Sequence, residues 1–148
     1  SRLPVAAMAV GFAQQATDLA TDFVCRMTMA GHPLVHYQNV QLALADMQAE
    51  TAAIRALVWQ YAKAWTPWQA RASIAKFYAT DRAQKVIERG MNLLGEHSLL
   101  HASEMEKAFR DNRLTRIFEG TNQINRLAVI EDQQDLLLAR ITGHRHCR

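Results

Sequence analysis

The sequence has 148 residues, of which 49% are hydrophobic and 21% are charged, and its formal net charge is +3. This composition is typical of one soluble globular domain and excludes a disordered chain. No apolar run approaches the roughly 20 residues of a membrane-spanning helix, and no basic face with interleaved aromatic residues indicates nucleic-acid binding.

The first predicted helix opens at Pro4, a residue that suits a first helical turn. Apolar residues then recur at three- or four-residue steps as far as Val24, and Gly31-His32-Pro33 ends the helix. Small residues are abundant along it: Ala6, Ala7, Ala9, Gly11, Ala13, Ala16 and Ala20. They would let neighbouring helices approach closely, either within this domain or between copies of it.

A second helical pattern runs from Leu34 to Tyr61 and stops at residues 65–67. Residues 66–69 read Thr-Pro-Trp-Gln, which is the Thr-x-x-Gln form of a capping box with Pro at the first helical position. A third helix is therefore expected from this point to about Gly95.

Residues 103–106, Ser-Glu-Met-Glu, form a second capping box, which predicts a short helix towards Arg116. The last predicted helix begins at Thr121 and continues to Gly143. Strand-like alternation flanked by tight turns is lacking.

We therefore expect an all-α fold, a four-helix-type up-down bundle over residues 1–143, followed by a tail at 144–148. Bundles of this kind serve many purposes, so the architecture alone names no function. Function has to be inferred from particular residues.

Glu119 is the most informative of these residues, because it stands beside a glycine and directly ahead of the last predicted helix. Gly120 can take backbone angles that are closed to other residues, and Thr121 can cap the helix that follows. A carboxylate fixed at such a break can serve as a general base. The alternative is a charged residue in an ordinary turn between helices.

The residues around this pair, Ile-Phe-Glu-Gly-Thr-Asn-Gln-Ile-Asn-Arg at 117–126, follow an Arg-Asp pair at 110–111. They closely resemble the C-terminal signature of the acyl-CoA dehydrogenase family, an aromatic residue and Glu-Gly-Thr-x-Gln-Ile after Arg-Asp. Other segments resemble further family runs: Gly31-His-Pro-Leu34, Gln38-Asn-Val-Gln41, Ala45-Asp-Met47 and Ala75-Lys76. The resemblance covers nearly the whole chain, but only the C-terminal helical domain of that family.

The resemblance implies an FAD-dependent acyl-CoA dehydrogenase of fatty acid metabolism, an oxidoreductase and flavoprotein. Glu119 would remove the pro-R α-proton of an acyl-CoA thioester while the β-hydride passes to flavin N5. Phe118 and Gly120 would lie beside the substrate, and the backbone N–H of Glu119 would help to hold the thioester carbonyl. Burial should raise the pKa of this base and a helix N-terminus should lower it. We expect burial to dominate once acyl chain and flavin exclude water.

The resemblance also implies FAD contacts. Thr121 and Gln123 match family positions that touch the flavin, although structurally they need only be an N-cap and a polar residue of a first helical turn. Gln38 matches a third such position.

The flavin side also departs from the family pattern in two regions. The family's flavin-phosphate arginine falls on Met27, with Arg26 one place away, and an alanine replaces the family's Phe nearby. In the glycine-rich run, Asn92 and Gly95 stand for the family's Gln and first Gly, while the second Gly becomes Glu96. These changes indicate a divergent branch with altered cofactor contacts, or weak FAD binding.

Partners follow from the same resemblance: an acyl-CoA thioester, electron-transfer flavoprotein or a similar acceptor, and further copies of the chain in a dimer or homotetramer whose subunits share flavin contacts. The complete family enzyme adds an N-terminal helical domain and a middle β-domain, so this fragment alone should have no turnover. Two alternatives stay open. One is a non-catalytic helical oligomerisation or binding module on the same scaffold, and the other is a flavin monooxygenase or oxidase relative.

No metal site is expected, because His97 and His101 have helical i, i+4 spacing but no third ligand is placed near them. Cys25 and Cys147 do not make a disulfide framework. The start of the chain shows no secretory signal, and its lack of an initiator Met fits a fragment or a processed chain. We expect a cytoplasmic location, or the mitochondrial matrix in a eukaryote.

Overall fold

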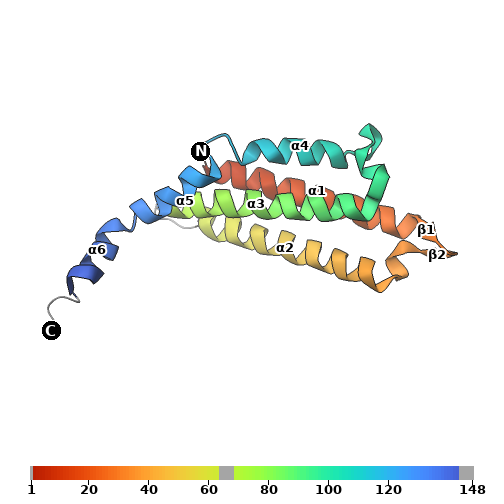
Figure 1. Ribbon diagram of the computed structural model, residues 1–148, viewed down its shortest axis with the longest axis horizontal. Coiled ribbons are helices and arrows are strands. Elements are labelled where there is room, and N and C mark those ends of the chain that lie inside the picture. Colours follow the sequence, from red (N-terminus) through yellow and green to blue (C-terminus); the bar gives the residue numbers. More distant parts are fainter. Residues whose placement is uncertain (1, 64–68, 144–148) are drawn as a thin grey trace.

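The computed structural model describes residues 2–63 and 69–143. Four of its helices lie side by side, and successive ones run in opposite directions (Figure 1). They are α1 (Arg2–Arg26), α2 (Gln38–Lys63), α3 (Gln69–Leu94) and α4 (Met105–Thr115). The expected all-α, up-down bundle of four helices is confirmed.

The core lies along α3, which packs against α1, α2 and α4. Where α1 meets α3, small side chains are fully buried on both helices, which lets the two backbones approach closely: Ala6, Ala9, Ala13, Ala16 and Ala20 on α1, and Ala75, Ala79 and Ala83 on α3. These five small residues of α1 therefore serve packing within the domain, whereas Ala7 and Gly11 are exposed. Larger side chains, among them Met47, Ile54, Ile87 and Met105, fill the spaces around this contact.

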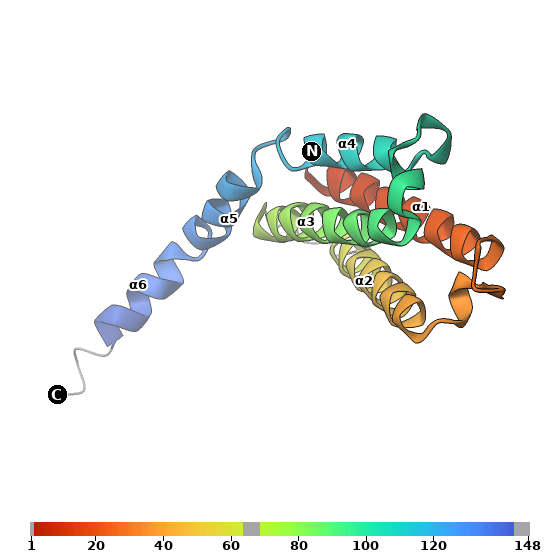
Figure 2. The same cartoon turned by 45° about the vertical axis from the view of Figure 1, so that its right-hand side comes forward.

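A small hairpin that the sequence pattern did not predict joins α1 to α2. In it β1 (Thr28–Met29) pairs antiparallel with β2 (His32–Pro33). Ala30 and Gly31 form the connection with φ values of 50° and 82°, as a two-residue turn of the primed type requires. The hairpin lies at one end of the bundle (Figures 1 and 2).

Two helices begin differently from the expectation. The 3-10 helix η1 (Leu34–His36) precedes α2, so α2 starts at Gln38. The prediction of a capping box at 103–106 is wrong, because the N-cap residue of α4 is Glu104. Its backbone is in the left-handed region with φ 59°, and its side chain makes no capping hydrogen bond. The Ser103 hydroxyl donates to the Leu100 carbonyl, 2.8 Å away, and its oxygen accepts from the Met105 N–H at 3.4 Å. Two 3-10 helices, η2 (Gly95–Leu99) and η3 (His101–Ser103), link α3 to α4.

The last predicted helix is divided into α5 (Asn122–Glu131) and α6 (Gln134–Gly143). Helix α5 packs against α3, whereas α6 extends away from the four helices of the bundle (Figure 2). The large apolar side chains of α6 are all exposed: Leu136, Leu137, Leu138 and Ile141.

Some expectations fall on residues outside those described, including most of the capping box at 66–69, Cys147 and the tail at 144–148. Trp59 is 59% exposed and thus lies on the surface of this chain. No helix among the described residues is both long and apolar enough to cross a membrane.

Candidate active site

Glu119 and Gly120 lie in the short connection between the end of α4 and the start of α5. Both have positive φ, 57° for Glu119 and 87° for Gly120, so the left-handed backbone predicted at the glycine extends to the carboxylate residue as well. The Asn122 N–H donates to the Arg116 carbonyl over 3.1 Å and closes the loop between the helices. The backbone of Glu119 is therefore constrained, although its side chain is exposed in this chain.

Thr121 begins α5 as predicted. Its side-chain oxygen accepts a hydrogen bond from the Ile124 N–H at 3.3 Å, which satisfies one of the unpaired donors of the first helical turn. Gln123 is an exposed residue of that same turn. The two residues expected to contact flavin therefore lie directly beside Glu119 along the chain.

A buried lysine lies beneath this turn. Lys76 of α3 has no solvent-exposed surface, and its Nζ donates to the Gly120 carbonyl at 2.7 Å and to Asn122 Oδ1 at 2.9 Å. Asn125, also fully buried, donates to the same carbonyl through Nδ2 at 2.8 Å. The Gly120 carbonyl is thus held by two side chains from two different helices.

Asn122 extends the network to an ion-paired aspartate. Its Nδ2 donates to Asp81 Oδ1 and to Thr80 Oγ1, at 2.9 Å each. Arg116 donates to Asp81 Oδ1 at 2.7 Å and Arg126 to Asp81 Oδ2 at 2.5 Å. These groups connect α3, the end of α4 and α5, and they anchor the Glu119–Gly120 turn to α3.

The Arg-Asp pair at 110–111 does not reach this turn. Arg110 pairs with Glu106, and Asp111 pairs with Lys107, both along the surface of α4. Arg116, further along the chain, is the arginine that contacts the network.

The pKa of the Glu119 carboxyl is below its ordinary value. The positive charges of Arg2 and Lys76 both act to lower it. Desolvation lowers the pKa of Lys76, partly offset by the charge of Asp81. For Asp81, burial favours a higher pKa, but hydrogen bonds from Arg126 and Asn122 and the charge of Arg116 together bring it below the ordinary value.

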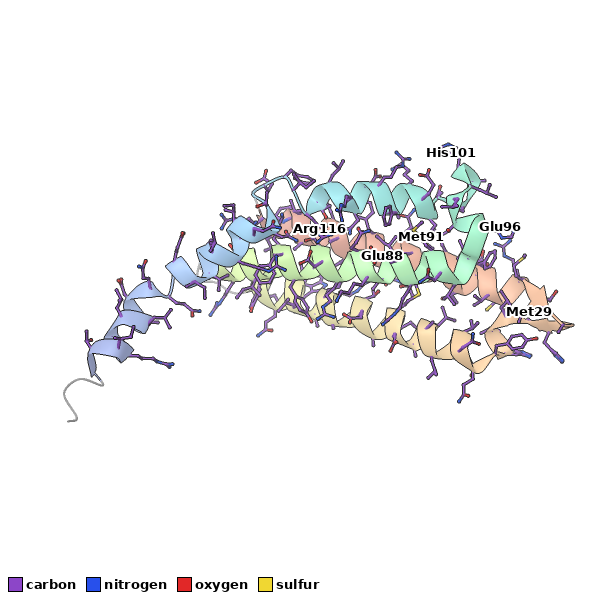
Figure 3. The ribbon with its side chains drawn as sticks, in the orientation of Figure 1. Met29, Glu88, Met91, Glu96, His101 and Arg116 are labelled. Atoms are coloured by element: carbon purple, nitrogen blue, oxygen red, sulfur yellow. The ribbon has the colours of Figure 1, made fainter. Side chains whose placement is uncertain are left out.

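The other four residues expected to bind FAD lie at the opposite end of the bundle. Arg26 ends α1, Gln38 begins α2, Asn92 is in the last turn of α3 and Gly95 follows it with φ 58°. Figure 3 shows the separation: Arg116 lies by the α4–α5 connection, while Met29 and Glu96 lie at the hairpin end. Lys76, which contacts the Glu119–Gly120 turn, and Asn92 are 16 residues apart on α3, which at 1.5 Å per residue is roughly 24 Å.

A cleft of about 330 Å³ opens at the hairpin end, and Arg26, Met27 and His97 are among the residues that line it. The Arg26 guanidinium is already engaged with Asp22 at 2.5 Å on the surface of α1. Because it is paired with Asp22, Arg26 is a poorer substitute for the family's phosphate-binding arginine.

The histidines near this cleft have ordinary roles. The His97 ring packs against Phe23 with ring centroids 5.2 Å apart, and His101 contacts Glu106 at 3.1 Å. Within the described part of the chain, no three His, Cys, Asp or Glu side chains come together as metal ligands.

Sequence reasoning missed four residues that support the turn: Lys76, Asp81, Asn122 and Asn125. The sequence did carry a signal for Lys76, because this lysine stands among the apolar positions of its helix. A lysine is rarely buried at such a position unless its ammonium group is paired, so the sequence indicated a partner. The two asparagines follow Thr121 at the start of α5, where polar residues are usual, so their burial had no visible sign.

Comparison with known proteins supports the resemblance seen in the sequence. The family model "Acyl-CoA dehydrogenase, C-terminal domain" matches residues 1–133. The short-chain specific acyl-CoA dehydrogenase of Bos taurus mitochondria is 34% identical over 86% of this chain and 32% of its own length. The chain thus spans about a third of the length of the curated relatives it matches.

Two solved structures share the fold with a TM-score of 0.83 and 30% identity, each over 86% of this chain and 34% of the other. One is the butyryl-CoA dehydrogenase of Megasphaera elsdenii. The other belongs to a study of the electron transferring flavoprotein of Acidaminococcus fermentans.

Proposed function

This chain belongs to the acyl-CoA dehydrogenase family, and we propose that it is the C-terminal part of an FAD-dependent enzyme in which Glu119 is the catalytic base. The observation that carries this proposal is the backbone of Glu119, held at φ 57° between two helices. A non-glycine residue in the left-handed region is uncommon and costs about 1–2 kcal/mol. Such residues gather at functional sites, where the surrounding structure compensates the strain.

The proposed reaction is α,β-dehydrogenation of an acyl thioester. The Glu119 carboxylate takes the α-proton, the β-carbon gives up a hydride, and a double bond forms between the two carbons. FAD, when bound, supplies the hydride acceptor. The Glu119 backbone N–H donates to the thioester carbonyl and stabilises the negative charge that develops there. Phe118, 41% exposed in this chain, provides an apolar wall beside the base.

The protonation state of Glu119 suits this role at neutral pH. Its pKa is lowered in this chain, so the carboxyl is ionised and able to accept a proton. Enclosure by an acyl chain and a flavin would remove water and oppose that shift. A raised pKa in the complete enzyme with bound substrate remains our prediction.

The residues next to Glu119 fit a flavin. The Thr121 oxygen accepts from Ile124, which leaves its hydroxyl proton to donate to a cofactor. Gln123 is exposed on the same turn and offers both donors and an acceptor. These two side chains would hold the part of FAD nearest the base.

Gln38, Asn92 and Gly95 lie at the opposite end of the bundle from Glu119. We therefore propose that they contact the flavin of a neighbouring copy, so that each site is built from two chains. This arrangement agrees with the homo-oligomer, a dimer or tetramer, that the family resemblance implies. Arg26 is the weakest member of the set because of its pairing with Asp22.

The proposal extends to the rest of the protein. The substrate would be an acyl-CoA thioester, the electron acceptor electron-transfer flavoprotein or a similar protein, and the location the cytoplasm or the mitochondrial matrix. The chain described here would have no turnover alone, because the remaining two thirds of such an enzyme complete the acyl pocket.

The test uses the complete protein that contains this chain. Purified enzyme should show the yellow flavin spectrum and bleach when an acyl-CoA is added without an electron acceptor. Glu119→Gln, a near-isosteric change that removes the base, should keep the flavin and reduce the bleaching rate by at least about a thousandfold, within the 10²–10⁴ range of general-base catalysis.

The other possible outcomes of this experiment point to another base or to one of the two alternative functions. Bleaching at the wild-type rate in Glu119→Gln would assign the proton abstraction to another group. A complete protein that neither binds flavin nor bleaches would favour the non-catalytic binding module. Flavin reduction by a substrate other than an acyl thioester would favour the monooxygenase or oxidase relative.

A further inference from the structure

Lys76 is the largest of the fully buried side chains among the described residues. Lysine is almost never fully buried unless its ammonium group is paired, because removing a charge from water is costly. No part of the proposed reaction uses this residue. Its burial therefore calls for a function that a smaller apolar side chain at the same place would not supply.

The contacts of Lys76 are concentrated on the segment that carries the base. Its Nζ lies 2.7 Å from the carbonyl oxygen of Gly120, the residue after Glu119, and 2.9 Å from Asn122 Oδ1. Hydrogen bonds from a charged donor are stronger than neutral ones. The ammonium thus ties the exit of the left-handed turn to α3, a helix whose neighbouring residues are in the core.

Several charged groups face Lys76 from the elements around it. Asp81 lies on the same helix, Arg2 on α1, Arg116 at the end of α4, and Glu119 on the turn itself. The Lys76 ammonium and the Glu119 carboxylate interact, since the charge of each favours the ionised form of the other. The lysine therefore acts on the carboxylate through both the backbone and the electrostatic field.

We propose that Lys76 is a positioning residue for the base: its ammonium group fixes the Glu119–Gly120 turn and places a positive charge behind the Glu119 carboxylate. This inference rests on the proposed function of Glu119. A role in stability alone would be satisfied by any well-packed side chain at this position. A positioning role predicts a defect in the proton-transfer step and in its pH dependence.

The electrostatic part has a definite sign. The Lys76 charge lowers the pKa of Glu119, so its removal raises that pKa. Arg2 lowers it too and remains in the variant. The base is then protonated over a wider acidic range, and the acid limb of the kcat/KM profile moves to higher pH.

The experiment compares Lys76→Met with wild type in the complete flavoenzyme. Single-turnover flavin bleaching by an acyl-CoA should slow at least about tenfold, which corresponds to about 1.4 kcal/mol, with flavin content retained and the acid limb shifted upward. Lys85→Met, an exposed lysine on the same helix, is the matched control and should leave both readouts unchanged.

Lys76→Gln keeps a buried donor without the charge, and it replaces Lys76→Met if that variant does not accumulate as folded flavoprotein. Its acid limb should still move upward. An unchanged bleaching rate and acid limb in a folded Lys76 variant would overturn the positioning role while leaving Glu119 as the base. Absence of bleaching in the wild type would instead reject the proposed function.

Discussion

At the scale of single residues, the candidate site depends on two consecutive left-handed residues of very different kinds. Gly120 adopts φ 87° without steric penalty. Glu119 adopts φ 57°, which is energetically costly. Hydrogen bonds to the backbone that follows it offset this cost. A side chain placed at Gly120 would add to this strain because of its positive φ, and its Cβ would lie in contact with Asn125 Nδ2 at 3.4 Å.

Gly120→Ala is therefore expected to lower the free energy of unfolding by about 1–2 kcal/mol, the cost of a left-handed L-residue. Urea denaturation of the protein at fixed concentration measures the change. Gly11→Ala is the matched control, because Gly11 lies within helix α1 and no atom outside that helix comes within 4 Å of the point that an added Cβ would occupy. This change should raise the free energy of unfolding by about 0.5–1 kcal/mol. Equal effects of both substitutions would contradict the account of strain at the turn.

At the scale of elements, Asp81 connects three helices. It accepts hydrogen bonds from Arg116 at the end of α4 and from Arg126 on α5, while its own backbone belongs to α3. Its side chain is 21% exposed, and those of Arg116 and Arg126 are 33% and 49% exposed. These ion pairs are therefore partly screened by solvent, yet their shared carboxylate holds the α4–α5 connection against the bundle.

Asp81→Asn should lower the free energy of unfolding at neutral pH by about 1.5–3 kcal/mol, the usual contribution of a hydrogen bond to a charged group. The folded-state pKa of Asp81 is depressed, so its contribution is present above the unfolded-state pKa and is lost as pH falls through the folded-state value. Urea denaturation at a series of acidic pH values should show the difference between variant and wild type shrinking.

The matched control for that series is Asp111→Asn, which removes a surface ion pair with Lys107 inside α4. Its effect should stay within about 1 kcal/mol, as for exposed pairs. A difference between Asp81→Asn and wild type that stays constant down to strongly acidic pH would show that the carboxylate charge is not what stabilises the connection.

Elements with a strong helical period were predictable from sequence, and so was the cap at Thr121. Other features were not predictable from the sequence, each for its own reason. The break between α5 and α6 follows no glycine or proline, and the hairpin at residues 28–33 is too short to show alternation. The burial of Asn122 depends on Asp81 and Thr80, about forty positions away, which no local pattern reports.

At the scale of the whole molecule, the bundle separates the two groups of candidate cofactor residues. Glu119, Thr121 and Gln123 lie at one end, and Gln38, Asn92 and Gly95 lie at the other. If each flavin site takes one group from each of two chains, a defect at one end of a chain affects a different site from a defect at its other end.

Two inactive variants of the complete enzyme should therefore restore activity when combined. Co-expression of Glu119→Gln with a Gln38→Ala, Asn92→Ala double variant gives mixed two-fold dimers in which one site is intact. For random assembly about half of the dimers are mixed, so about a quarter of all sites should turn over. Acyl-CoA-dependent bleaching of the mixture measures this fraction, with each parent variant expressed alone as control. Activity no greater than that of the parents would show that one chain supplies both ends of its own site.

The hydrogen bonds that anchor the Glu119–Gly120 turn come from α3, the end of α4 and α5. A chimaeric relative that received this stretch of chain would inherit the orientation of the carboxylate with it, while its choice of fatty acyl group would still come from the host.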